Sequence, residues 1–127
     1  MQFSVKITDH QKNTMLNICD VELLGKNIVQ DEMNINISKS YYGEKLIEKE
    51  EAKMLMEKSS IINMVGKETT SLSIDLGIGS ENGIKLIDNI PFLIVLKCNM
   101  LLHFNSYIIF NFKKNLFYLI GEKFFNV

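Results

Sequence analysis

The chain has 127 residues, enough for one hydrophobic core and too few for two comfortable domains. Its 46% hydrophobic and 23% charged residues are typical of a globular protein and exclude the disordered, collagen-like and disulfide-rich classes. The formal net charge is -1, so the chain lacks the positive electrostatic field of non-specific nucleic-acid binders. Arginine is absent, so no guanidinium group is available to make paired hydrogen bonds to a phosphate or a guanine. No DNA partner is therefore expected.

Two strands joined by a hairpin turn are predicted at the start of the chain. Apolar and polar residues alternate over 3–7, and the same period returns over 14–18. The polar segment 9–13 between them has the composition of a turn. A third strand with one solvent-exposed face is predicted over 33–38, where apolar residues again alternate with Asn and Ser.

One short helical turn is predicted over 20–26, between the second and third strands. Asp20 is expected to accept hydrogen bonds from the free backbone N–H groups of this turn. Gly25 is expected to end the turn in a left-handed conformation.

Two amphipathic helices are predicted in the middle of the chain. The first covers 48–57, with apolar residues on one side and charged residues on the other. The second is predicted to begin at Ser59 or Ser60 and to end at Gly77. Gly66 inside it costs about 1 kcal/mol relative to alanine, which indicates a close backbone approach, here of helix to sheet.

A closing hairpin is predicted from two apolar runs, 84–87 and 92–96, on either side of a turn at 88–91. Helices segregated from a largely antiparallel sheet predict an α+β fold of two layers, a small sheet with the two amphipathic helices packed on one face. Residues 1–97 are predicted to form this single domain. Residues 98–127 are predicted to be an atypical C-terminal extension, apolar and rich in Phe, Asn and Lys.

The composition changes near the proline at position 91. Residues 1–91 hold ten lysines and fourteen acids, whereas 92–127 hold four lysines, one acid and seven of the eight phenylalanines. The tail has three open interpretations: an added structural layer, a membrane anchor, or out-of-frame translation of an AT-rich gene. Its longest stretch without a charge, 98–112, is shorter than the ~18 residues of a spanning helix, so a membrane span ranks last. Burial of the tail in a second copy would give a homo-oligomer.

Five short motifs occur in an order that resembles the archaeal domain-of-unknown-function family 424. They are CDVELLGK at 19–26, SYYGEKL at 40–46, EKEEAKML at 48–55, INMVGKET at 62–69 and IKLIDNIP at 84–91. The resemblance covers roughly residues 1–91 and implies a small α+β fold found in archaea. The resemblance implies no established activity. It also implies that the genes of family members often lie near genes for translation and ribosome-export factors.

The chain departs from this family pattern at two places. Glu44 stands where family members tend to have a second glycine, and Phe92, Leu93 and Ile94 stand where they tend to have His-Ala-Gln. If the histidine segment carries the function of the family, this chain lacks it, because the nearest downstream histidine is His103.

Catalytic and metal-binding motifs are mostly excluded. VGKET at 65–69 is no phosphate-binding loop, since Ile61 replaces a required Gly and Glu68 a required Ser or Thr. Cys19 and Cys98 form no CxxC pair and are predicted to be buried, reduced thiols. We expect no cofactor and no metal. A small enzyme using Cys19 or Asp20 stays as an alternative, and it requires a cleft with converging polar groups.

The adjacent rings of Tyr41 and Tyr42 are the candidate contact residues. In an extended loop they would point to opposite sides, so that one ring anchors inward and the other faces out. An exposed ring beside Lys39 and Lys45 could stack on a nucleobase, worth ~1 to 3 kcal/mol per base, or cover an apolar patch of a partner. The predicted binding residues are Lys39, Tyr41, Tyr42, Gly43 and Lys45. The structural alternative has one ring buried and the other packed across the glycine.

These observations predict a non-enzymatic binding module associated with translation or RNA metabolism, whose partner is a translation-related protein or RNA. The alternatives are a small enzyme of unknown reaction and a protein associated with a membrane through its tail. The N-terminus has charges where a signal peptide needs an unbroken apolar stretch, so a cytoplasmic location is expected.

Overall fold

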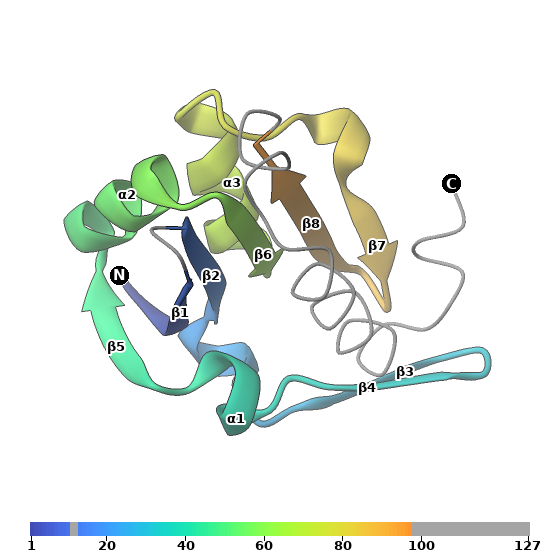
Figure 1. The fold of residues 1–127 in the computed structure, drawn as a ribbon. Coiled ribbons are helices and arrows are strands. Elements are labelled where there is room, and N and C mark those ends of the chain that lie inside the picture. Colours follow the sequence, from blue (N-terminus) through green and yellow to red (C-terminus); the bar gives the residue numbers. More distant parts are fainter. Residues whose placement is uncertain (11–12, 98–127) are drawn as a thin grey trace.

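A computed structural model describes residues 1–10 and 13–97 of the chain. Figure 1 shows a central sheet, helices α2 and α3 beside it, and a separate two-stranded hairpin. The strands are β1 (Gln2–His10), β2 (Asn13–Asp20), β3 (Asn27–Gln30), β4 (Met33–Asn36), β5 (Lys45–Glu48), β6 (Ile61–Val65), β7 (Lys85–Ile87) and β8 (Ile90–Leu96). The helices are α1 (Lys39–Tyr42), α2 (Lys49–Lys58) and α3 (Lys67–Asp75), with single 3₁₀ turns η1 (Val21–Leu23) and η2 (Glu81–Gly83).

The central sheet has six strands in the order β5-β1-β2-β6-β8-β7. All neighbouring pairs are antiparallel except β2 and β6, which run parallel. The fold is therefore broadly α+β with a mostly antiparallel sheet, but the sheet is larger than the small one that the sequence predicts. The difference arises because the sequence pattern predicts a helix where β6 lies, and predicts no strand where β5 lies, between the tyrosine loop and the first helix.

Strand β6 corrects the prediction of one long helix from Ser59 or Ser60 to Gly77. All five residues of β6 are buried between β2 and β8, and helix α3 begins only at Lys67. Four of the five residues of β6 are apolar and the fifth, Asn63, is buried as well, so the strand shows no period of two and the spacing of Ile61 and Val65 resembles a helical stripe. Gly66, with a φ of 112°, separates the strand from the helix.

The two faces of the sheet are covered by different elements. Helices α2 and α3 share a buried cluster with one face, in which Leu16, Met56 and Leu72 lie. The hairpin β3–β4, the turn η1 and the helix α1 contribute to a second cluster that includes Ile28, Ile35 and several sheet residues. The sequence predicts two layers, the sheet and the helices, and does not predict that these elements cover the second face.

Several local predictions are confirmed. The hairpins β1–β2 and β7–β8 are present, and α2 buries Ala52, Leu55 and Met56 as its apolar side predicts. In the turn between β7 and β8, Asp88 and Asn89 have φ values of 52° and 62°, the pattern of a type I′ turn. Strand β3 was not predicted, because it is only four residues long and holds just two apolar residues.

The predicted extension, 98–127, lies outside the described residues, as do its three interpretations. Within 1–10 and 13–97, none of the helices has the length and apolar character needed to cross a membrane.

Candidate functional site

The junction between β6 and α3 forms one wall of the candidate site. Strands β2 and β6 are parallel, with Cys19 paired to Val65, so their carboxyl ends reach the same edge of the sheet. Asp20 therefore lies directly beside Gly66, where α3 begins. A Cβ atom on Gly66 would collide with the Asp20 carboxylate, so the junction requires glycine for its φ of 112° and for this close contact.

Asp20 binds the amino end of α3. Its carboxylate accepts hydrogen bonds from the backbone N of Glu68 at 3.1 Å, from the backbone N of Thr69 at 2.8 Å and from the Thr69 hydroxyl at 2.7 Å. The first amides of a helix have no partner within the helix and carry a partial positive charge, which a carboxylate satisfies. The prediction that Asp20 caps its own turn is wrong, since η1 has no side-chain cap.

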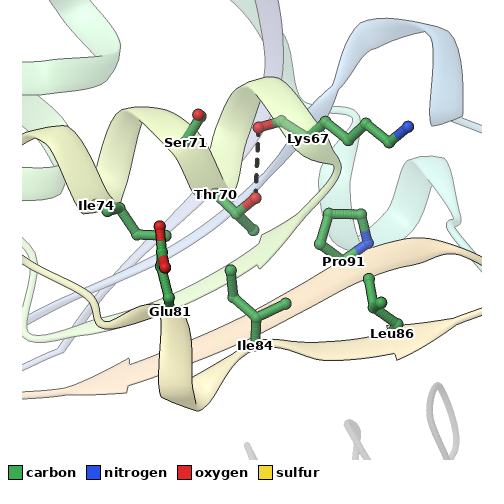
Figure 2. A pocket seen from close by; sticks show the side chains of 8 residues that line it. All are labelled: Lys67, Thr70, Ser71, Ile74, Glu81, Ile84, Leu86 and Pro91. Atoms are coloured by element: carbon green, nitrogen blue, oxygen red, sulfur yellow. Dashed lines mark hydrogen bonds between the residues drawn. The ribbon is translucent and has the colours of Figure 1, made fainter.

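An open groove runs along this junction, made of two adjoining cavities that share Lys67 and Pro91 in their walls. The larger, about 500 Å³, lies between α3 and β7, and Figure 2 shows the side chains around it. The smaller, about 260 Å³, lies toward η1 and the β7–β8 turn. We call the two cavities together the α3 groove. Their other lining residues are Thr70, Ser71, Ile74, Glu81, Ile84 and Leu86 in the larger cavity, and Asp20, Glu22, Leu23, Glu68, Asn89 and Ile90 in the smaller.

The α3 groove combines apolar side chains with acidic ones. Leu86 lies on β7 and Ile84 directly precedes this strand, and both line the larger cavity together with residues of α3. Leu86 is 62% exposed, so part of the apolar lining of the larger cavity is in contact with solvent. The groove has an apolar floor that is still in contact with solvent.

The predicted tyrosine segment is a helix, α1, and not an extended loop. Tyr42 is only 2% exposed, and its hydroxyl accepts a hydrogen bond from Asn63 Nδ2 at 2.6 Å. Its backbone carbonyl accepts from Ser4 Oγ at 2.5 Å, and burial raises the pKa of its phenol. Tyr41 is half-buried and packs against the same core cluster. The structure therefore places one ring in the core and the other at its edge.

The other three predicted contact residues, Lys39, Lys45 and Gly43, lie on or beside α1 and β5. Lys39 is exposed at the start of α1. Lys45 lies on β5 and forms an ion pair of 2.9 Å with Glu51. Gly43 ends α1, and a Cβ there would lie 2.8 Å from the Lys39 carbonyl oxygen, which is too close for any other residue without a shift. Lys39 and Tyr41 are the members of the predicted set whose side chains are neither buried nor joined to another described residue by an ion pair.

The residues proposed for an enzyme are engaged in structural roles. Cys19 is buried, and its burial, followed by the charges of Asp20 and Glu22, raises the pKa of its thiol to about 12. A thiol with such a pKa is not a nucleophile near neutral pH. The Asp20 carboxylate is occupied by α3. Among the described residues no group of three potential metal ligands is present, and Cys98 and His103 lie outside them.

A family model agrees with the motif order. The model described as protein of unknown function (DUF424) matches residues 7–98, which is more than half of the chain. The chain belongs to this family. The match confirms the resemblance and extends it past Pro91 into Phe92, Leu93 and Ile94, where the chain departs from the expected His-Ala-Gln.

Among solved structures, this member of the DUF424 family is similar to a crystal structure of an uncharacterized conserved protein from Methanopyrus kandleri. The two share 23% sequence identity with a TM-score of 0.63, over 76% of this chain and 94% of the other. This likeness concerns the fold alone. A search of curated proteins finds no match.

The α3 groove was not predicted from the sequence. Reading Ile61–Val65 as a strand would have placed Gly66 at a strand-to-helix junction, opposite the carboxyl end of a parallel neighbour. The signal was present in the five consecutive apolar or amide residues before Gly66, because such a short run bounded by glycine is as typical of a buried strand as of a helix.

Proposed function

We propose that this chain is a non-enzymatic binding module and that its partner, a protein, binds in the α3 groove. The observation that carries the proposal is the exposure of Leu86 in the wall of the larger cavity, next to Ile74, Ile84 and Pro91. Contiguous apolar surface in a hollow, bordered by charged groups, is typical of protein–protein contact sites.

A protein fits the α3 groove better than a nucleic acid does. The exposed charged residues of the groove are Glu22, Glu68 and Glu81 against the single cation Lys67. Phosphate groups would be repelled by this excess of carboxylates, because nucleic-acid affinity depends on neutralising lysines and arginines. We therefore propose a protein partner, and from the gene neighbourhoods that the resemblance implies we look for it among translation-associated proteins of an archaeal cell.

Site-specific photo-crosslinking tests the proposal, with a matched control that the sheet itself offers. Leu86 on β7 and Leu46 on β5 are both exposed leucines, at 62% and 53%, on the two opposite edge strands. A benzophenone amino acid in place of Leu86 is expected to form an adduct with one protein in cells, identified by mass spectrometry and then shown to bind with purified components. The same group at position 46 is expected to give none. Equal adducts from both positions, or adducts only from position 46, would overturn the proposal.

A further inference from the structure

We infer that the α3 groove selects a partner segment in which a large apolar residue is flanked on both sides by lysine or arginine. This inference rests on the proposed function and adds the chemistry of the partner. It follows from the apolar side chains of the larger cavity and from the carboxylates of the two cavities, which join neither salt bridge found within residues 1–10 and 13–97.

The carboxylates of the groove have no ion-pair partner among the described residues. The two salt bridges found within 1–10 and 13–97 join Lys45 to Glu51 and Lys53 to Glu50, both away from the groove. Glu22, Glu68 and Glu81 are exposed and take part in neither. A carboxylate that is paired with none of the described cations can bind a cation brought by another molecule.

The exposed carboxylates are divided between the two cavities of the α3 groove, and Lys67 lines both cavities. Glu81 belongs to the larger cavity, whereas Glu22 and Glu68 belong to the smaller one. Figure 2 shows Glu81 and Lys67 toward opposite sides of the larger cavity, with Ile84 between them. A cation near the middle would be repelled by Lys67, and cations at the ends would meet carboxylates.

The apolar floor determines what lies between the two cations. Ile74, Ile84, Leu86 and Pro91 line the larger cavity, whose volume of about 500 Å³ exceeds that of one side chain. Burying a leucine-sized side chain there would remove part of the exposed surface of Leu86 from water, which is favourable in proportion to the apolar area. An acidic segment of the same shape would meet three carboxylates and bind more weakly.

Three short synthetic peptides with blocked ends test the inference on the purified full chain. They are Lys-Ala-Leu-Leu-Ala-Lys, the same peptide with Glu in place of Lys, and the same peptide with Ser in place of Leu. Binding is followed by backbone amide chemical shifts. The lysine–leucine peptide is expected to shift the amides of Lys67, Ser71 and Leu86, and to bind on the order of tenfold more tightly than either of the others.

Charge-reversal variants locate the contact. Glu22→Lys and Glu81→Lys, one from each cavity, are each expected to weaken binding of the lysine–leucine peptide severalfold. Glu32→Lys is the matched control, because Glu32 is an exposed acid between β3 and β4 and lines neither cavity. Unchanged affinity in both groove variants, or an equal loss in the control, would overturn the inference.

Failure of the inference can be told from failure of the proposed function. If the glutamate peptide shifts the same groove amides as strongly, the groove is a binding surface but its preference for cations is wrong. If carbodiimide joins Glu68 or Glu81 to a lysine of this chain beyond residue 97, its own C-terminal segment is the occupant, which overturns the inference. If no peptide shifts the groove amides and the Leu86 crosslink also fails, both are wrong.

Discussion

Gly66 combines two constraints that no other residue type meets. Its φ of 112° lies in a region open to glycine, and the space where a side chain would begin is filled by the Asp20 carboxylate. The sequence predicts a close approach of helix to sheet at this position, whereas the close contact joins the Gly66 backbone to the Asp20 side chain just before α3 begins. It did not predict the neighbour, because the carboxylate comes from 46 positions earlier in the chain, at the end of β2.

A pair of alanine substitutions separates the two constraints on Gly66. Gly77 has a φ of 72° but nothing within 4 Å of its absent Cβ, so Gly77→Ala is expected to cost only the backbone strain, about 1 to 2 kcal/mol. Gly66→Ala adds the collision and is expected to cost about 2 to 5 kcal/mol. The free energy of unfolding in urea measures both. Equal losses would show that the contact with Asp20 is unimportant.

The buried thiol of Cys19 is expected to make the free energy of unfolding depend on pH in the alkaline range. The pKa of its thiol is about 12 in the folded chain and 9.0 ordinarily, so the unfolded chain loses this proton first as the pH rises. The contribution of the protonated thiol to the free energy of unfolding is therefore complete below pH 9 and is lost as the pH rises toward 12. At pH 10.5 the wild type is expected to lose up to about 2 kcal/mol relative to pH 8 from this group.

The Cys19→Ala variant is the control for this pH dependence. It removes the thiol, so its free energy of unfolding should fall less between pH 8 and pH 10.5 than that of the wild type, whatever its stability at pH 8. Tyr42, whose phenol pKa is also raised by burial, contributes to the fall in both proteins. A parallel fall in the two proteins would show that Cys19 ionises normally in the folded state.

At the scale of elements, sequence patterns predicted those that expose one face. Alternation over 3–7 and 14–18 gave β1 and β2, and the two-sided composition of 48–57 gave α2. Strand β6 could not be recognised in this way, because both of its faces are buried and its one polar residue, Asn63, is buried as well. The misassignment of β6 also hid the α3 groove, because α3 forms one wall of the groove and begins only after β6 ends.

Asp20 links β2 to α3, and its removal is predicted to loosen the start of that helix. Asp20→Ala loses three hydrogen bonds and a favourable charge, so we expect the free energy of unfolding to fall by about 2 to 3 kcal/mol. Asp20→Asn keeps one acceptor oxygen and should lose about half as much. Hydrogen exchange at the Glu68 and Thr69 amides should accelerate in both variants. Unchanged exchange at these amides would contradict the proposed role of Asp20.

Across the whole molecule, the family, the broad α+β class and the mostly antiparallel sheet were predictable, because ordered motifs and short-range periodicity carry them. The candidate surface was not. The sequence directs attention to Tyr41 and Tyr42, yet only three-dimensional packing shows that Tyr42 bonds to Asn63 inside the core. Leu86 could not be singled out from sequence, because an exposed leucine and a buried one look alike in an apolar run.

The most direct test of the α3 groove is the dissociation constant of the protein partner for three variants of the full chain. Leu86→Asp is predicted to weaken binding by on the order of tenfold or more, since it places a charge on the apolar floor. Leu46→Asp and Tyr41→Ala are predicted to change the dissociation constant less than about threefold. Strong loss in Tyr41→Ala, with Leu86→Asp unchanged, would contradict the account and return the binding surface to α1.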